Sequence, residues 1–279
     1  NIDQKMGLKA SPTCTKNFGD KDGCIGELLG ERSRGMQIIF QMMNEARILV
    51  GLQGVAHASA AYLHAREYAQ DRLQGASIEN MKDPTAPRAP IIGHPDVRRM
   101  LLTMKGYAEG LRALALYASY CADRHLTEEG EEAETWHGRL ELLTPIVKAY
   151  SSDMGFRMCE LGVQTYGGYG YCQEYPVEQF LRDCKIASIY EGANGIQAMD
   201  LLGRKIGMHG GKPFMALMEE IAGLAKRLEG GPLSGEAEII ARGSKELGDA
   251  AMHLLKSFQQ GKVGLTLSNA CPILELMGD

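Results

Sequence analysis

Residues 136–166 read WHGRLELLTPIVKAYSSDMGFRMCELGVQTY, and this stretch decides the fold class. Its large apolar side chains recur at spacings of three and four residues, at Leu143, Ile146, Val147, Tyr150, Met154, Met158 and Leu161. That spacing is the period of one helix face, so the sequence predicts a long helix. The glycine pair that follows Tyr166 predicts its end.

The same period occurs elsewhere in the chain. One stripe begins near Met36 and runs to about Leu73, and another begins after Pro95 and reaches Cys121. Gly51 and Gly54 lie inside the first stripe, where they would allow close approach of another backbone. Shorter helices are predicted at 176–188 and 193–208, and two more after Pro213. Residues 75–93 form a loop, because their prolines and glycines forbid a continuous helix. Long helices with further partners predict a mainly α fold, an antiparallel helix bundle.

Composition excludes several classes of protein. With 279 residues, 44% of them hydrophobic and 23% charged, the chain can bury a sizeable core and is not disordered. The net charge of -5 offers no electrostatic footprint for nucleic acid. No apolar run approaches the roughly 20 residues of a membrane span.

Cysteine usage points to a reducing compartment. The seven cysteines are scattered, and no C-x-x-C pair occurs, which argues against a disulfide scaffold and a zinc site. The cytoplasm is the expected location. Glu134 and His137 have the E-x-x-H spacing of di-iron bundles, but those bundles use two such pairs, so no metal is expected.

The most informative stretch lies between the predicted helices, from Gln164 to Gln197. Three glycines, Gly167, Gly168 and Gly170, would let the backbone approach a partner closely. Glu191 is a lone carboxylate next to Gly192 in an otherwise apolar segment. If it is desolvated, its pKa rises and it can act as a base near neutral pH. The alternative from the residues alone is a helix-terminal glutamate bonded to backbone amides.

Four motifs in this stretch occur in the order and spacing of a known family. They are Gln-x-x-Gly-Gly-x-Gly at 164–170, Glu-Tyr-Pro at 174–176, Arg-Asp at 182–183 and Ile-Tyr-Glu-Gly at 189–192. Together they resemble the signature of the flavin-dependent acyl-CoA dehydrogenases, and the resemblance covers about residues 1–207. Residues 208–279 and the loop 75–93 are similar to a subgroup with an extra C-terminal helical segment, which includes methylmercaptopropionyl-CoA dehydrogenases.

The resemblance divides the chain into three parts. Residues 1–30 are rich in turn formers such as Pro12 and would be the end of the family's central β domain, a short β remnant. Residues 31–207 would be its C-terminal helical bundle domain, and 208–279 the additional helical segment. The chain starts without Met and stops within an apolar pattern, so we expect a fragment that by itself binds FAD poorly and does not turn over.

The resemblance also implies a reaction and its residues. Glu191 would be the catalytic base that removes the proton next to the thioester carbonyl, while hydride passes from the next carbon to flavin N5 of FAD. The product would be a trans-2-enoyl-CoA. The substrate-binding candidates are Asn44, Arg47 and Gly192, although Arg47 fits a surface salt bridge equally well. The cofactor-binding candidates are Arg72, Gln164, Gly167, Gly168, Ala193, Asn194 and Gly195.

Four departures from the family's pattern occur among these candidates. Ala193 stands where Thr is usual, Gly195 replaces a common Gln, Asn44 stands where many members have Asp, and the segment after Arg72 lacks the usual Phe. The resemblance also implies a homodimer or homotetramer that passes its electrons to an electron-transfer flavoprotein. An acyl-CoA oxidase would share the first half-reaction, and a helical scaffold without chemistry is the alternative from another class.

Overall fold

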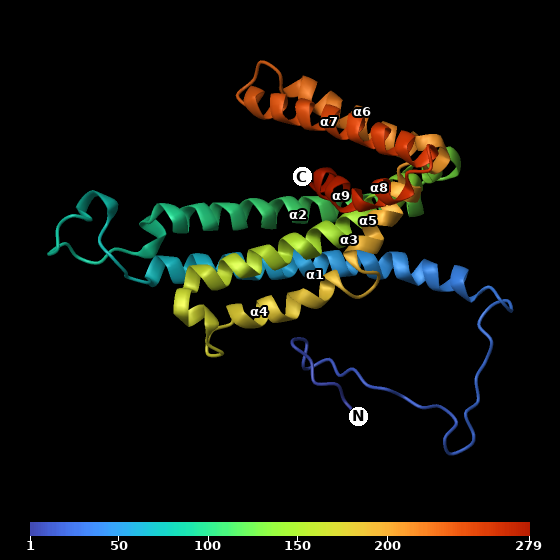
Figure 1. The fold of residues 1–279 in the computed structure, drawn as a ribbon, viewed down its shortest axis with the longest axis horizontal. Helices are drawn as coiled ribbons and strands as arrows, with labels where there is room; N and C mark the ends of the chain where they lie inside the picture. Colours follow the sequence, from blue (N-terminus) through green and yellow to red (C-terminus); the bar gives the residue numbers. More distant parts are fainter. The chain divides into compact units, whose positions relative to one another are not determined.

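The computed structural model describes the backbone of residues 1–279 and every side chain except that of Gln41. Three long helices, two short ones and four C-terminal helices follow one another along the chain (Figure 1). They are α1 (Gly35–Asp71), α2 (Pro95–Thr127), α3 (Gly130–Tyr166), α4 (Val177–Cys184), α5 (Asn194–Asp200), α6 (Lys212–Leu228), α7 (Ser234–Gln259), α8 (Val263–Ser268) and α9 (Ala270–Gly278). The prediction of a mainly helical bundle is confirmed. The sequence pattern indicated α6 and α7 but missed α8 and α9.

Short 3₁₀ and π segments join these helices. The 3₁₀ segments are Ile78–Asn80, Ile91–Gly93, Gly167–Tyr171, Lys185–Ser188 and Met208–Gly211, and Leu201–Lys205 is a π turn. The chain divides into two compact units, of which unit 1 is Asn1–Gly110 with Ser152–Glu191, and unit 2 is Leu111–Ser151 with Gly192–Asp279. The domain boundaries at 30/31 and 207/208 stay a prediction.

In unit 1, α1 packs against α4 and against the C-terminal half of α3. Small residues make the second contact possible. A Cβ on Gly155 would lie 2.6 Å from the carbonyl oxygen of Gly54, so α3 needs glycine at the crossing. Seven residues further along both helices, a Cβ on Gly162 would lie 3.4 Å from the Cβ of Ala61, which is an ordinary van der Waals contact. The buried face of α1 continues through Ala58, Ala65 and Ala69.

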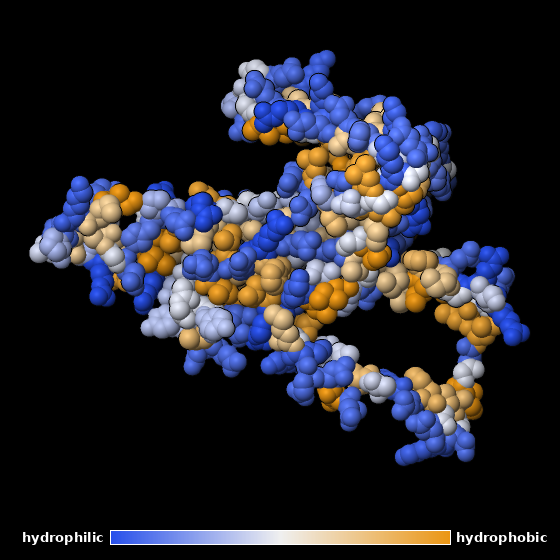
Figure 2. All heavy atoms as spheres, in the orientation of Figure 1, coloured by the Kyte–Doolittle hydropathy of each residue, from blue (hydrophilic) through white to orange (hydrophobic). Residues whose placement is uncertain are grey.

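Residues 1–34 of unit 1 contain one isolated antiparallel bridge, between Ile2 and Cys14, in place of strands. Two contacts tie their start to α4. Arg182 donates to the carbonyl of Met6 at 2.8 Å, and the backbone N–H of Leu8 donates to Asp183 at 2.6 Å. Further along, the apolar side chains of Phe18, Ile25, Leu28 and Leu29 are exposed, as the orange atoms of this segment show (Figure 2).

In unit 2, α6 and α7 form an antiparallel pair, and α9 packs against α5 and α7. Arg139 of α3 connects this pair to α2. Its guanidinium donates to the Tyr117 hydroxyl at 2.6 Å and to the Glu220 carboxylate of α6 at 2.5 Å. The Arg139 side chain is only 11% exposed, so this contact is partly shielded from solvent.

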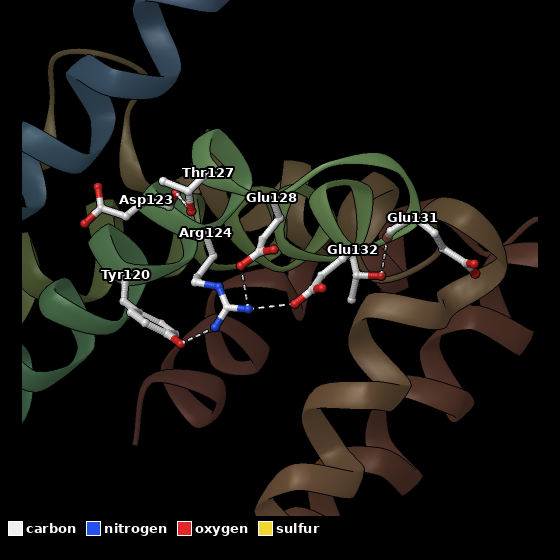
Figure 3. A network of polar contacts seen from close by, with 8 residues as sticks. Tyr120, Asp123, Arg124, Thr127, Glu128, Glu131 and Glu132 are labelled. Carbon is white, nitrogen blue, oxygen red and sulfur yellow. Dashed lines mark hydrogen bonds and ion pairs between the residues drawn. The ribbon is translucent and has the colours of Figure 1, made fainter.

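The turn between α2 and α3 is short and lies within the acidic run at 128–132. Glu131 and Glu132 belong to the first turn of α3. Negative charge is favourable there, because it faces the positive end of the helix dipole. Arg124 of α2 bonds to Glu128 at 2.8 Å and to Glu132 at 2.6 Å, and donates to Tyr120 (Figure 3).

No helix among the described residues combines the length and the apolar composition needed to cross a lipid bilayer.

Candidate active site

Glu191 lies in a tight turn between the 3₁₀ segment Lys185–Ser188 and α5. Its backbone φ is 55° and that of Gly192 is 89°. Glycine adopts such angles freely, but for a glutamate the left-handed region costs roughly 1–3 kcal/mol. A residue keeps this conformation only where its surroundings hold it, and such residues gather at functional sites. The structure therefore gives the half-buried Glu191 a backbone geometry typical of a functional residue.

Tyr190 ties this turn to α1. Its hydroxyl donates a hydrogen bond to the side-chain oxygen of Gln53. Burial raises the pKa of Tyr190, and the negative charge of Glu191 adds to that rise. The phenol is therefore a neutral group beside the carboxylate at physiological pH.

A cavity of about 600 Å³ lies beside Tyr190 within unit 1. Residues from the start of the chain and from the segment after α4 line it together: Lys5, Met6, Gly7, Leu8, Ser11, Thr13, Arg182, Lys185, Ile186, Ile189 and Tyr190. The contacts between residues 6–8 and the Arg-Asp motif thus shape the surroundings of the residue that precedes Glu191.

Lys148 of α3, which the sequence analysis did not identify, holds the other side of the turn. Its side chain is fully buried, at 0% exposure. The ammonium donates to the carbonyl of Gly192 at 2.7 Å and to the side-chain oxygen of Asn194 at 2.8 Å. The amide nitrogen of Asn194 donates back to the carbonyl of Ala149 at 3.1 Å. Both ends of the Asn194 amide are therefore bonded within the chain.

The neighbouring residues predicted to touch flavin are exposed. Ala193 precedes the first residue of α5, and Gly195 lies in its first turn. A Cβ on Gly195 would meet no other atom within 4 Å, so packing within the chain does not require glycine there.

The predicted substrate residues Asn44 and Arg47 lie about one turn apart on α1. Gln53, the partner of Tyr190, follows six residues after Arg47 on the same helix. Both predicted residues are half-buried, and the Nε atom of Arg47 is buried without a hydrogen-bond partner among the described side chains. A buried donor left unsatisfied is costly, and the role of Arg47 in substrate binding stays a prediction.

A second group of predicted residues lines a cavity of about 530 Å³, also in unit 1. It contains Arg72, Gly167 and Gly168, whereas Gln164 is exposed on the last turn of α3 and does not line it. Tyrosines that the sequence analysis did not single out form much of the wall. The Arg72 guanidinium lies 5.1 Å from the ring centre of Tyr169.

Two more rings complete this wall. Tyr68 stacks on Tyr166 with ring centres 4.0 Å apart. Burial raises the pKa of Tyr68, and the positive charge of Arg72 opposes the rise. The cavity therefore combines flat apolar faces with one cation, which suits a ligand that carries an aromatic ring and phosphate.

The three glycines of the motif have different structural roles. A Cβ on Gly167 or Gly168 would meet no other atom within 4 Å, and Gly167 has a φ of 62°. A Cβ on Gly170 would lie 2.3 Å from the carbonyl oxygen of Val163, so this glycine is required for packing. Close approach to a ligand was predicted for all three glycines. Only Gly167 and Gly168 have the open space that it needs, because Gly170 packs within the chain.

Comparison with known proteins identifies the family of the chain. The family model described as "Acyl-CoA dehydrogenase, C-terminal domain" matches residues 33–206. The chain is 44% identical over 209 residues to the broad-specificity linear acyl-CoA dehydrogenase FadE5 of Mycobacterium tuberculosis, covering 74% of this chain and 34% of the relative. It is 38% identical to 3-methylmercaptopropionyl-CoA dehydrogenase of Ruegeria pomeroyi, covering 100% of this chain and 47% of the relative.

Solved structures show the same fold. Butyryl-CoA dehydrogenase from Megasphaera elsdenii matches with a TM-score of 0.57 and 29% identity, over 73% of this chain and 47% of that one. Caenorhabditis elegans ACDH-11, solved in complex with C11-CoA, matches with a TM-score of 0.80 and 23% identity, over 99% of this chain and 44% of that one. The chain thus spans less than half the length of these relatives, and the residues after 207 are matched in the larger alignments. It belongs to the acyl-CoA dehydrogenase family.

Proposed function

We propose that the protein oxidises an acyl-CoA thioester to the trans-2-enoyl-CoA, with Glu191 as the base and FAD as the cofactor. The observation that carries the proposal is the left-handed turn that presents Glu191 within the Ile-Tyr-Glu-Gly motif. The names of the relatives, which act on linear acyl-CoA, 3-methylmercaptopropionyl-CoA and butyryl-CoA, support an acyl-CoA substrate.

The reaction requires two functions of the Glu191 turn, which are proton abstraction and polarisation of the thioester carbonyl. The carboxylate must take the weakly acidic proton from the carbon next to the thioester carbonyl, and a general base in position contributes typically 10²–10⁴-fold in rate. The carbonyl oxygen must also be polarised as negative charge develops on it, and the backbone N–H of Glu191 is the donor that the family resemblance assigns. Gly192 would lie against the substrate, with Asn44 and Arg47 of α1 contacting its CoA portion or the site wall.

The residues around the tyrosine-lined cavity fit a flavin nucleotide. Arg72 offers a cation for the pyrophosphate, and the open space above Gly167 and Gly168 allows close approach. Gln164 would lie at the adenine side, and the backbone of residues 193–195 would contact flavin. When bound, FAD supplies the acceptor for the hydride that leaves the substrate.

We further propose that electrons leave through an electron-transfer flavoprotein and that the protein assembles as a homodimer or homotetramer. In this arrangement residues 1–30 would belong to the central β domain, and a neighbouring subunit would share the FAD site. These assignments rest on the family resemblance and not on a contact in the structure.

The test is Glu191→Gln in the full-length protein. Acyl-CoA-dependent bleaching of the flavin should slow roughly 10²–10⁴-fold, because the amide cannot accept the proton. FAD content should be unchanged. Glu160→Gln, which alters an exposed glutamate of α3, is the control and should bleach at the wild-type rate. Equal rates in both variants would remove Glu191 from the mechanism, and reoxidation by oxygen in place of electron-transfer flavoprotein would indicate an acyl-CoA oxidase.

A further inference from the structure

Lys148 is unusual among the charged residues of unit 2. It has 0% exposure, in a stretch of α3 where every residue from 142 to 152 is buried. A buried ammonium is costly unless polar groups surround it, so a lysine at such a position needs a compensating role. The contacts of its Nζ with the 192–194 segment, described above, supply that compensation.

A second buried lysine offers a comparison. Lys205 is 5% exposed and forms an ion pair with the Glu141 carboxylate at 2.9 Å, a contact that joins α3 to the π turn. The Lys148 contacts instead go to a carbonyl and an amide oxygen in the segment that directly follows Glu191. The two lysines therefore hold different parts of the same unit.

The Gly192 carbonyl is held from two sides. Besides Lys148, the side-chain amide of Gln197 makes a longer contact with it, at 3.4 Å, and Gln197 is only 1% exposed. A peptide carbonyl fixed in this way fixes the rotation of the backbone around residue 192. Because Glu191 directly precedes residue 192, this anchor lies next to the turn that presents Glu191.

We propose that Lys148 is a positioning residue for the Glu191 turn. Its ammonium holds the Gly192 carbonyl and the Asn194 amide against α3 and so keeps residues 191 and 192 in their left-handed conformation. The role in catalysis rests on the proposed function of Glu191. A displacement of about 1 Å at a reacting group can cost 10²-fold in rate, so loss of the anchor should act on the chemical step.

The experiment compares Lys148→Met with Lys205→Met in the full-length protein. Both variants remove a buried ammonium from unit 2, but only the first releases the Gly192 carbonyl. At saturating acyl-CoA, flavin bleaching by Lys148→Met should be at least about 10-fold slower than by Lys205→Met, and the half-saturating acyl-CoA concentration should change less than the rate. Lys148→Gln, which keeps a neutral donor group, should lie between the wild type and Lys148→Met.

A second measurement does not depend on activity. Backbone hydrogen exchange in the peptide that covers residues 189–197 should be faster in Lys148→Met than in Lys205→Met. If Lys148→Met does not fold, Lys148→Gln takes its place in this comparison. Unchanged exchange of this peptide would overturn the anchor. Faster exchange with an unchanged bleaching rate would overturn its part in catalysis. If none of the acyl-CoA thioesters tested bleaches the flavin of the wild-type protein, the proposed function fails. The exchange result still decides whether Lys148 holds the turn.

Discussion

Individual side chains in this structure differ in how strongly the fold controls their protonation. The Tyr117 hydroxyl, on α2, lies between the Arg139 guanidinium and the Glu220 carboxylate. Burial raises the pKa of Tyr117 from 10.0 to about 12, against the opposing effect of Arg139 and with a further rise from Glu220. The phenol is thus held in its neutral form by desolvation more than by its charged neighbours.

This shift predicts how stability depends on alkaline pH. Between about pH 10 and pH 12 the unfolded chain releases the Tyr117 proton while the folded chain retains it. The contribution of this group is therefore present in full below pH 10 and is lost as pH rises toward 12. A tyrosinate absorbance titration should contain a late step that disappears in Tyr117→Phe.

Tyr171→Phe provides the matched control for that titration, because this side chain is 89% exposed. The late step should persist in Tyr171→Phe. Its persistence in Tyr117→Phe would assign the late ionisation to another phenol and would contradict the prediction.

Sequence reasoning singled out Glu191 as the candidate base but not Lys148, and the reason is physical. Glu191 is a carboxylate next to Gly192 in an otherwise apolar segment, and it lies in the motif that carries the family resemblance. No local feature of the sequence distinguishes Lys148 from other lysines. Periodicity assigns polar residues to the solvent face, but α3 is buried on all sides from 142 to 152, so a lysine there turns inward. Its partners are more than 40 residues away in the sequence.

At the level of elements, the long helices were predictable because their apolar stripes extend over many turns. Residues 263–278 were not, because two helices of six and nine residues offer too few turns for a period. The crossing of α1 and α3 was predictable only in part. Gly54 within the predicted stripe indicated close approach of a backbone, and the structure confirms it with Gly155 as the partner. Nothing in the sequence identified that partner.

The crossing predicts a specific pair of stability changes. Gly155→Ala would place a Cβ 2.6 Å from the Gly54 carbonyl oxygen, so the helices must separate. We expect a loss of about 1–3 kcal/mol in the free energy of unfolding, measured by urea denaturation. Gly106→Ala is the control, because Gly106 is exposed on α2 and its Cβ would meet no other atom within 4 Å.

The control should move in the opposite direction. Alanine is favoured over glycine in a helix interior by up to about 1 kcal/mol, so Gly106→Ala should stabilise the protein. Equal effects of the two substitutions, in either direction, would show that helix propensity decides both positions and that the crossing has room for a methyl group.

On the scale of the whole molecule, the two compact units share continuous backbone in two helices. The unit boundary at 110/111 lies inside α2, and the boundary at 151/152 lies inside α3. A helix that unfolds at one end loses the cooperative hydrogen bonding that supports the other. The units are therefore expected to unfold together, although each has its own core.

Buried cysteines in both units can test whether the units unfold together. Cys159 and Cys184 are buried in unit 1, and Cys121 is buried in unit 2. Burial raises the pKa of Cys121 to about 11, and a hydrogen bond with the Cys184 thiol, together with burial, raises that of Cys159. All three should resist alkylation in the native protein, Cys121 and Cys159 because their reactive thiolate form is disfavoured, and Cys184 because it is buried. The exposed Cys271 should react quickly and provides the internal control.

Labelling in increasing urea, with each thiol followed by mass spectrometry, then measures the opening of each unit. If the units unfold together, Cys121 and Cys159 become reactive over the same urea range, because both require the same global opening. Exposure of Cys121 at a lower urea concentration than Cys159 would instead show that unit 2 opens first, and that helical continuity through α2 and α3 does not couple the two cores. Lys205→Met, which breaks an ion pair within unit 2, sharpens the comparison. In a coupled molecule it should shift the exposure of all three buried thiols to lower urea by the same amount.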